Sequence, residues 1–316
     1  MAETTRVLCV DGDPDLLRYL ETLLAADGHE VLAARSGAEG KTLLQGTRPV
    51  HVVFAGYRSA AGEGTEFLAE VRRLSPASVR IGLRREADAA ADDPAVESGR
   101  VYKSLSVPLD GETARATAGN ALERFRLVEA LRGKEDDVLR SVAEEVELRD
   151  PYTRGHCDRV ADVALKIASA LGLPGEETSA LRRGAWLHDC GKIGVPEAIL
   201  NHPGKLTPEQ FAVVKRHPRW GADVARDAGL PDGVLDILLH HHERFDGKGY
   251  PSGAGGQRIP LAARIVAVAD VFDAATADRP YARGYDREGA MRVMGVMRGG
   301  AFDPEVVDAL FGVLKG

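Results

Sequence analysis

The clearest indication of the fold is the stretch HHERFDGKGYP at residues 241–251, followed by a segment rich in Gly and Pro that runs to Pro260. From Asp150 to the C-terminus, the surrounding sequence shows helical spacing of apolar residues and no alternating strand pattern of any length. A long loop inside a compact helical domain is usually functional. We therefore expect an all-α domain whose functional site lies beside this loop.

Histidine is concentrated in the same half of the chain, which holds seven of the nine histidines. Asp189 directly follows His188, and Asp270 interrupts the apolar run from Ile265 to Val271. A carboxylate in such a helix is costly unless it meets a cation, and several imidazoles are available to share a metal ion. Imidazole and carboxylate ligands favour Fe, Mn, Zn or Ni over Ca or Mg. The pattern therefore predicts a metal site.

Four motifs in this half resemble, in the same order, those of the HD-GYP subgroup of the HD phosphohydrolases. They are DPYTRGH at 150–156, HDCGK at 188–192, the quoted stretch at 241–251, and DVFD at 270–273 with RPY at 279–281. The short HD pair alone is a weak signal, whereas the eleven-residue stretch is specific. The resemblance covers most of residues 147–316.

The resemblance implies a helical domain that holds two divalent metal ions, commonly iron or manganese, with Asp189 bridging them. Family members with a third metal have a Glu four residues before the first ligand, where this chain has Tyr152. We therefore expect a two-metal site. The ligands implied by the motif match are His156, His188, Asp189, His217, His241, His242 and Asp270.

The expected chemistry is metal-assisted hydrolysis of a phosphodiester. Two metal ions lower the pKa of a bridging water, so that hydroxide forms near neutral pH, and they neutralise charge on the phosphoryl oxygens. We expect Asp189 and Lys192 to be catalytic, because Lys192 follows His188 by one helical turn and can point its ammonium at a phosphate. The expected substrate-binding residues are Lys192, Arg279, Arg283, Gly249, Tyr250 and Pro251.

The family's usual substrate is cyclic di-GMP, so the resemblance implies cleavage to linear pGpG and on to GMP. The segment Gly247–Pro251 would enclose the substrate and contact partner proteins. Two alternatives stay open. One is a phosphohydrolase that acts on another cyclic dinucleotide or nucleotide, and the other is a catalytically weak or inactive module that binds a cyclic dinucleotide or a partner.

The first hundred residues alternate between short apolar runs and helical spacing, which predicts a doubly wound α/β domain with a parallel sheet. The pattern resembles a response-regulator receiver domain whose phosphorylation chemistry is lost. The acid pair is reduced to Asp11 and Asp13 around a glycine, and Ala55 stands at the phosphoacceptor position. Arg84 replaces the Ser or Thr, and Val107 replaces the Lys before Pro. We expect residues 1–112 to act by protein contact.

Residues 113–146 lack proline and mix charged with apolar side chains, which predicts one connector helix or two helices broken near Gly133. A solvated connector and a homodimer helix are both compatible with its irregular apolar seam. The HD-GYP domain would then occupy residues 147–316.

The composition of the chain limits its possible partners and its location. The net charge of −7, from 41 basic and 48 acidic residues, argues against a nucleic-acid polymer or an anionic membrane surface as partner. No apolar run approaches the length of a membrane helix. The three cysteines have no CxxC spacing, which favours a reduced, cytoplasmic protein without disulfides.

Overall fold

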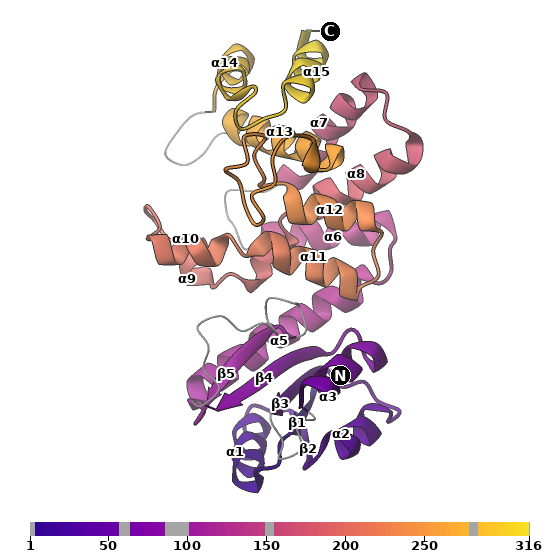
Figure 1. Cartoon of the computed structure of the whole chain (residues 1–316), viewed down its shortest axis with the longest axis vertical. Helices are drawn as coiled ribbons and strands as arrows, with labels where there is room; N and C mark the ends of the chain where they lie inside the picture. Colours follow the sequence, from indigo (N-terminus) through magenta and orange to yellow (C-terminus); the bar gives the residue numbers. More distant parts are fainter. Residues whose placement is uncertain (1–3, 57–63, 86–100, 149–154, 278–283, 316) are drawn as a thin grey trace. The chain divides into compact units, whose positions relative to one another are not determined.

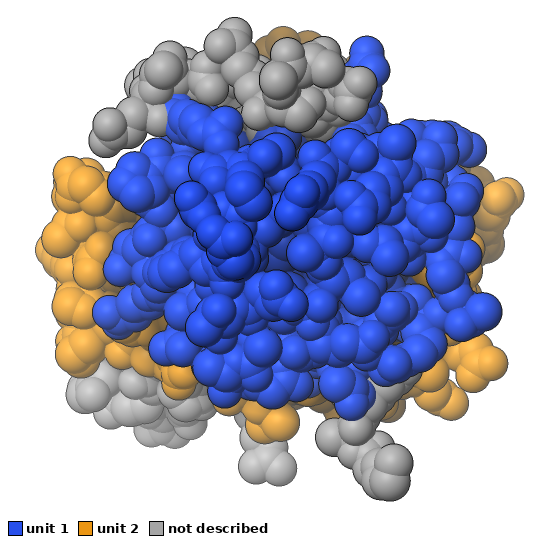
Figure 2. Space-filling model, turned by 90° about the horizontal axis from the view of Figure 1, so that it is seen from below, with its two compact units in different colours: residues 1–129 blue, residues 130–316 orange. Residues whose placement is uncertain are grey.

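The computed structural model describes residues 4–56, 64–85, 101–148, 155–277 and 284–315. The chain divides into two compact units, Met1–Glu129 and Ala130–Gly316, which Figure 2 distinguishes by colour. Each unit has its own hydrophobic core. No helix among the described residues combines the length and the apolar character that crossing a membrane requires.

The first unit is a five-stranded parallel sheet with helices on both sides (Figure 1). Its strand order is β2-β1-β3-β4-β5, which is the order of the doubly wound receiver fold. The predicted α/β receiver-like domain is therefore confirmed. The strands are β1 Arg6–Val10, β2 Glu30–Ala34, β3 Val52–Gly56, β4 Val79–Arg85 and β5 Lys103–Val107; the helices are α1 Pro14–Ala25, α2 Gly37–Leu44, α3 Gly64–Leu74 and α5 Gly111–Leu131.

The end of the sheet where a receiver is phosphorylated has different chemistry here. Ala55 lies buried in β3 and offers no carboxylate. Asp13 caps α1, accepting from the backbone N–H of Asp15 and Leu16, as its position before a helical pattern predicts. Arg85, the last residue of β4, places Nη2 3.3 Å from Oδ1 of Asp11 and 3.7 Å from Oδ2 of Asp13. A guanidinium thus pairs with both members of the acid pair that the receiver resemblance singles out.

The predicted connector contains two helices. α5 ends at Leu131, and α6 spans Asp136–Glu147, with Lys134 at a positive φ of 56° between them. The apolar face of α6 is buried against α7, α8 and η2 in the second unit. The boundaries expected at residues 112 and 147, and a homodimer through residues 113–146, stay predictions.

The second unit is all-α, as predicted. Its central helix, α13, is buried on most sides because apolar residues occupy most of its surface, and it packs against α7, α12, α14 and α15. The helices are α7 His156–Ala170, α8 Gly175–Leu187, α9 Glu197–Leu200, α10 Pro208–Val214, α11 His217–Asp227, α12 Asp232–His240, α13 Leu261–Thr276, α14 Arg287–Met297 and α15 Pro304–Lys315, with 3₁₀ turns η2 Cys190–Gly194 and η3 Gly256–Arg258.

Candidate metal centre and active site

Helix ends bring the histidines of the second unit together. His156 is the first residue of α7 and His217 is the first residue of α11. His188 directly follows α8, and His241 directly follows α12. Because α7 packs on α8 and α11 packs on α12, residues far apart in the sequence meet in one buried cluster.

The cluster forms two groups of potential metal ligands that share one carboxylate. In each group, one ligand atom per residue lies within 4.8 Å of all the others. The first group is Asp189, His217, His241 and His242, and the second is His156, His188 and Asp189. The remaining predicted ligand, Asp270, places Oδ1 3.3 Å from Nε2 of His156. Membership of Asp189 in both groups is the arrangement that a bridging carboxylate requires.

Three of the imidazoles have their orientation fixed by the backbone. The Nδ1 atoms of His188, His217 and His241 each lie 2.8–2.9 Å from the carbonyl oxygen of the residue three positions earlier. Since a carbonyl only accepts, Nδ1 carries the proton and the lone pair of each neutral ring is on Nε2. All three Nε2 atoms are therefore available as ligand atoms.

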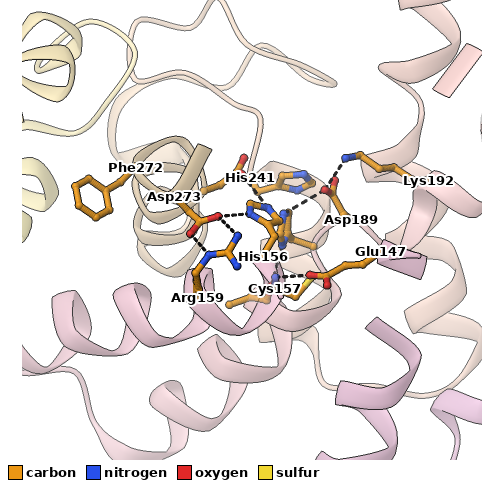
Figure 3. A network of polar contacts seen from close by, with 12 residues as sticks. Glu147, His156, Cys157, Arg159, Asp189, Lys192, His241, Phe272 and Asp273 are labelled. Carbon is orange, nitrogen blue, oxygen red and sulfur yellow. Dashed lines mark hydrogen bonds and ion pairs between the residues drawn. The ribbon is translucent and has the colours of Figure 1, made fainter. Parts of the chain in front are cut away.

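The fourth imidazole, His156, is held by a side chain that the sequence analysis assigned no role. Its Nδ1 donates to Oδ2 of Asp273 at 2.7 Å, and the same carboxylate accepts from Nε of Arg159 at 2.6 Å (Figure 3). Asp273 is buried and lies three residues after Asp270 on α13. That spacing, which places both acids on one helical face, was the available signal.

The donor set fits divalent cations. Nε2 of His188 is buried and has no hydrogen-bond partner among the described residues, and it lies 3.4 Å from Oδ2 of Asp189. Nε2 of His217 lies 3.2 Å from Nε2 of His241, so two ring lone pairs face each other. Buried polar atoms of native proteins nearly always have a partner. Cations shared with Asp189 would satisfy these nitrogens.

Burial keeps the first group of rings neutral, as metal ligation requires. Desolvation, together with neighbouring imidazoles, lowers the pKa of His217 to about 3 and that of His242 to about 4. Desolvation also lowers the pKa of His241 well below its ordinary value. These rings are therefore neutral at neutral pH, and those of His217 and His241 carry no proton on Nε2 because their Nδ1 atoms donate to carbonyl oxygens.

In the second group, charged neighbours shift the pKa values in the direction opposite to the effect of burial. Burial alone would lower the pKa of His156, but its bonds with Asp270 and Asp273 raise that pKa to about 10. Burial would raise the pKa of Asp189, but Lys192 and His188 hold it well below its ordinary value. Asp189 is thus ionised and paired with the ammonium of Lys192.

Lys192 lies beside the shared carboxylate, but in a different local structure from the one expected. α8 ends at Leu187, so Lys192 follows in the 3₁₀ turn η2 instead of one turn farther along the same α-helix. Its Nζ lies 2.7 Å from Oδ2 of Asp189 (Figure 3). The turn passes close to α11, and a Cβ on Gly191 would overlap the carbonyl oxygen of His217, so only glycine fits there.

The loop after His242 contributes one aromatic side chain to the cluster. The ring of Tyr250 lies 4.9 Å from that of His242. Gly249 is needed for close backbone packing, because a Cβ there would overlap the backbone of residues 242–244, and Pro251 is partly buried. Of the other expected substrate-binding residues, Arg279 and Arg283 lie outside the described part of the chain, as does Tyr152.

Glu147, at the end of α6, is a second residue that the sequence analysis missed. Its Oε2 accepts from the backbone N–H of Gly155 at 2.8 Å, and its Oε1 accepts from that of Cys157 (Figure 3). These two N–H groups flank His156. Because the partners of Glu147 are backbone atoms, the sequence contains no complementary residue that could have identified the contact.

Comparison with known proteins places this site in a family. The family model described as "HD domain" matches residues 140–306. The cyclic di-GMP phosphodiesterase response regulator RpfG of Xanthomonas campestris pv. campestris is 37% identical over 287 residues, which cover 83% of this chain and 75% of the relative. The chain belongs to the HD domain family.

Two further relatives widen the comparison. A cyclic di-GMP phosphodiesterase of Thermotoga maritima is 30% identical over 337 residues, covering 98% of this chain and 90% of its own. The 3′3′-cGAMP-specific phosphodiesterase 2 of Vibrio cholerae is 33% identical over 194 residues, covering 61% of this chain and 37% of its own.

Proposed function

We propose that the protein is a metal-dependent phosphodiesterase that hydrolyses the 3′–5′ phosphodiester of cyclic di-GMP to linear pGpG and then to GMP. The observation that carries the proposal is the position of Asp189 in both ligand groups. The relatives named as cyclic di-GMP phosphodiesterases, which match over most of both chains, support the substrate.

The proposed mechanism assigns metal binding to Asp189, Asp270 and the histidines, and phosphate contact to Lys192. Two bound divalent cations would supply a nucleophile at neutral pH and neutralise charge on the phosphate. Asp189 would hold both cations, with the histidine nitrogens and Asp270 completing their ligands. Lys192, 2.7 Å from Asp189, would direct its ammonium at a non-bridging phosphate oxygen. Arg279, Arg283 and the loop residues Gly249–Pro251 are proposed to hold the rest of the substrate.

The metals are proposed to be two iron or two manganese ions. Nitrogen-rich ligands combined with carboxylates support a transition metal over Mg²⁺ or Ca²⁺. The three cysteines are free and buried, which is consistent with our proposal of a cytoplasmic protein. We also propose that the receiver-like unit and residues 247–251 contact signalling partners, and that residues 113–146 form a homodimer interface.

A second candidate substrate is another cyclic dinucleotide. The Vibrio cholerae relative, whose name specifies 3′3′-cGAMP, supports it. A third candidate is a binding module without turnover, and the buried Ala55 of the receiver-like unit supports that one, because phosphorylation cannot act there. Cyclic di-GMP is favoured because the relatives that match most of this chain are named for it.

The test is hydrolysis by protein purified without oxygen and loaded with Fe²⁺ or Mn²⁺. Chromatography should detect pGpG or GMP from cyclic di-GMP, and the double variant His188→Ala/Asp189→Ala should form neither. His240→Ala is the matched control, because His240 precedes the ligand pair but its Nδ1 bonds to Asp236 O outside the cluster. Absence of turnover with both metals would refute the proposal, and 3′3′-cGAMP in parallel would identify the alternative.

A further inference from the structure

A series of aromatic rings leads outward from the first ligand group. The ring centre of His217 lies 5.0 Å from that of His242, and the ring of His242 lies 4.9 Å from that of Tyr250. Tyr250 in turn meets Phe211 edge-on, with 6.4 Å between ring centres. Two successive ring contacts therefore connect a ligand histidine to Phe211 on α10.

The exposure of these rings increases along the series. His217 is 1% exposed, His242 and Tyr250 are partly buried, and Phe211 is 45% exposed. A buried metal cluster needs a side from which a ligand enters, and this series of rings extends from the cluster to the surface. A single exposed apolar residue is ordinary, but Phe211 is the outer member of a series of rings that begins at a ligand histidine.

Local structure holds Phe211 near the metal ligands. α10 begins with a capping box formed by Thr207 and Gln210 and ends at Val214, and His217 begins α11 three residues later. Lys215, between them, places Nζ 5.3 Å from the centre of the Phe211 ring. An accessible aromatic ring and a positive charge thus lie together in the segment that supplies a ligand.

We propose that Phe211, together with Tyr250 and Lys215, forms a subsite for a purine nucleobase whose phosphate lies at the metal cluster. This inference rests on the proposed function and assigns the side on which the substrate's base binds. Aromatic side chains bind bases by stacking, which tolerates different bases because each has a π-face. Lys215 adds attraction for an anionic nucleotide.

The test compares two ligands that differ by the base alone. Isothermal titration calorimetry of the Mn²⁺-loaded full-length protein would measure binding of GMP and of ribose 5-phosphate. Phe211→Leu keeps apolar volume but loses the aromatic face. It should weaken the affinity for GMP about tenfold and leave the affinity for ribose 5-phosphate unchanged. Phe211→Trp should retain the affinity for GMP. Tyr19→Leu, at a similarly exposed aromatic residue on α1, is the matched control.

The subsite is overturned if Phe211→Leu lowers the affinity for both ligands equally, or if that variant binds GMP as tightly as the wild type. It is also overturned if the wild type binds GMP no more tightly than ribose 5-phosphate. The proposed function fails separately. If GMP binding depends on Phe211 but cyclic di-GMP is not hydrolysed, the nucleobase subsite stands and the phosphodiesterase assignment does not.

Discussion

The imidazole of His156 is held between two carboxylates of one helix. Its Nδ1 lies 2.7 Å from Oδ2 of Asp273, and its Nε2 lies 3.3 Å from Oδ1 of Asp270. Because Asp273 accepts the Nδ1 proton, Nε2 is the atom that faces the ligand cluster. Arg159 keeps Asp273 in place with two further bonds. The orientation of the first ligand of the site is thus set before a metal binds.

Replacing Asp273 should weaken metal binding without removing a ligand. In Asp273→Asn, the side-chain amide offers a donor as well as an acceptor, so the Nδ1 proton of His156 is no longer enforced. Loss of such outer partners typically costs about 10- to 100-fold in metal affinity. Competition with a chelator for Mn²⁺ would measure the change.

The control for that variant is Asp303→Asn. Asp303 is also buried and also pairs with an arginine, Arg264, and its side-chain hydrogen bonds among the described residues go to Arg264 and to the backbone of Glu305, outside the metal cluster. The Asp303→Asn variant should lower the stability of the protein to urea and leave its Mn²⁺ affinity unchanged. Equal losses of affinity in both variants would show that Asp273 acts only through the stability of the unit.

Asp189 should determine the occupancy of both metal positions. Asp189→Asn removes the charge common to the two ligand groups, whereas His217→Ala removes a member of the first group alone. We expect elemental analysis to find about two metal ions per chain in the wild type, about one in His217→Ala and fewer than one in Asp189→Asn. Retention of two metal ions by Asp189→Asn would contradict a shared carboxylate.

Metal affinity should increase with pH. The pKa of His156 is raised to about 10, so this ring is protonated in the metal-free protein at neutral pH and must lose a proton on ligation. The proton therefore competes with the metal at any pH below about 10. The rings of His217 and His242 have lowered pKa values and are already neutral, so they release no proton when metal binds. Calorimetry at pH 7.5 in buffers of different ionisation enthalpy should detect proton release, and buffer-independent heats would refute it.

The receiver-like unit should resist phosphorylation even after its acceptor is restored. Acetyl phosphate should add no mass to the wild type, because Ala55 has no carboxylate. Ala55→Asp alone should stay unmodified, since Arg85 occupies the acid pair of Asp11 and Asp13 that would bind Mg²⁺. Ala55→Asp/Arg85→Ala frees that pair. Mass spectrometry that found Ala55→Asp phosphorylated with Arg85 present would contradict this account, provided that circular dichroism shows each variant folded.

The fold could be predicted because it depends on local patterns, and six of the residues predicted as metal ligands come together in the structure. Strands such as Val52–Gly56 are continuous apolar runs, as buried parallel strands are. The ligand residues His188 and Asp189 belong to short motifs whose residue types and order carry the chemistry. The alanine at position 55, where the receiver resemblance expects a phosphoacceptor aspartate, can likewise be seen in the sequence.

Residues that act on those ligands were not predictable from the sequence. Asp273 was read only as part of a motif, since nothing in the sequence shows that His156 approaches it across 117 positions. Glu147 bonds to backbone groups, and Arg85 reaches Asp11 only when β1 and β4 lie in the same sheet. Each of these contacts depends on tertiary structure. The spacing of Asp270 and Asp273 indicates a shared helical face but does not identify His156 as the partner.

Glu147 determines where this chain can be shortened. A fragment that begins after Glu147 would lack this side chain, and the N–H groups of Gly155 and Cys157 would lose their acceptor. Such a fragment would also uncover the buried face of α7, α8 and η2 that α6 occupies. An excised catalytic unit should therefore include α6 from Asp136, since removal of that helix would loosen the backbone on both sides of the first metal ligand.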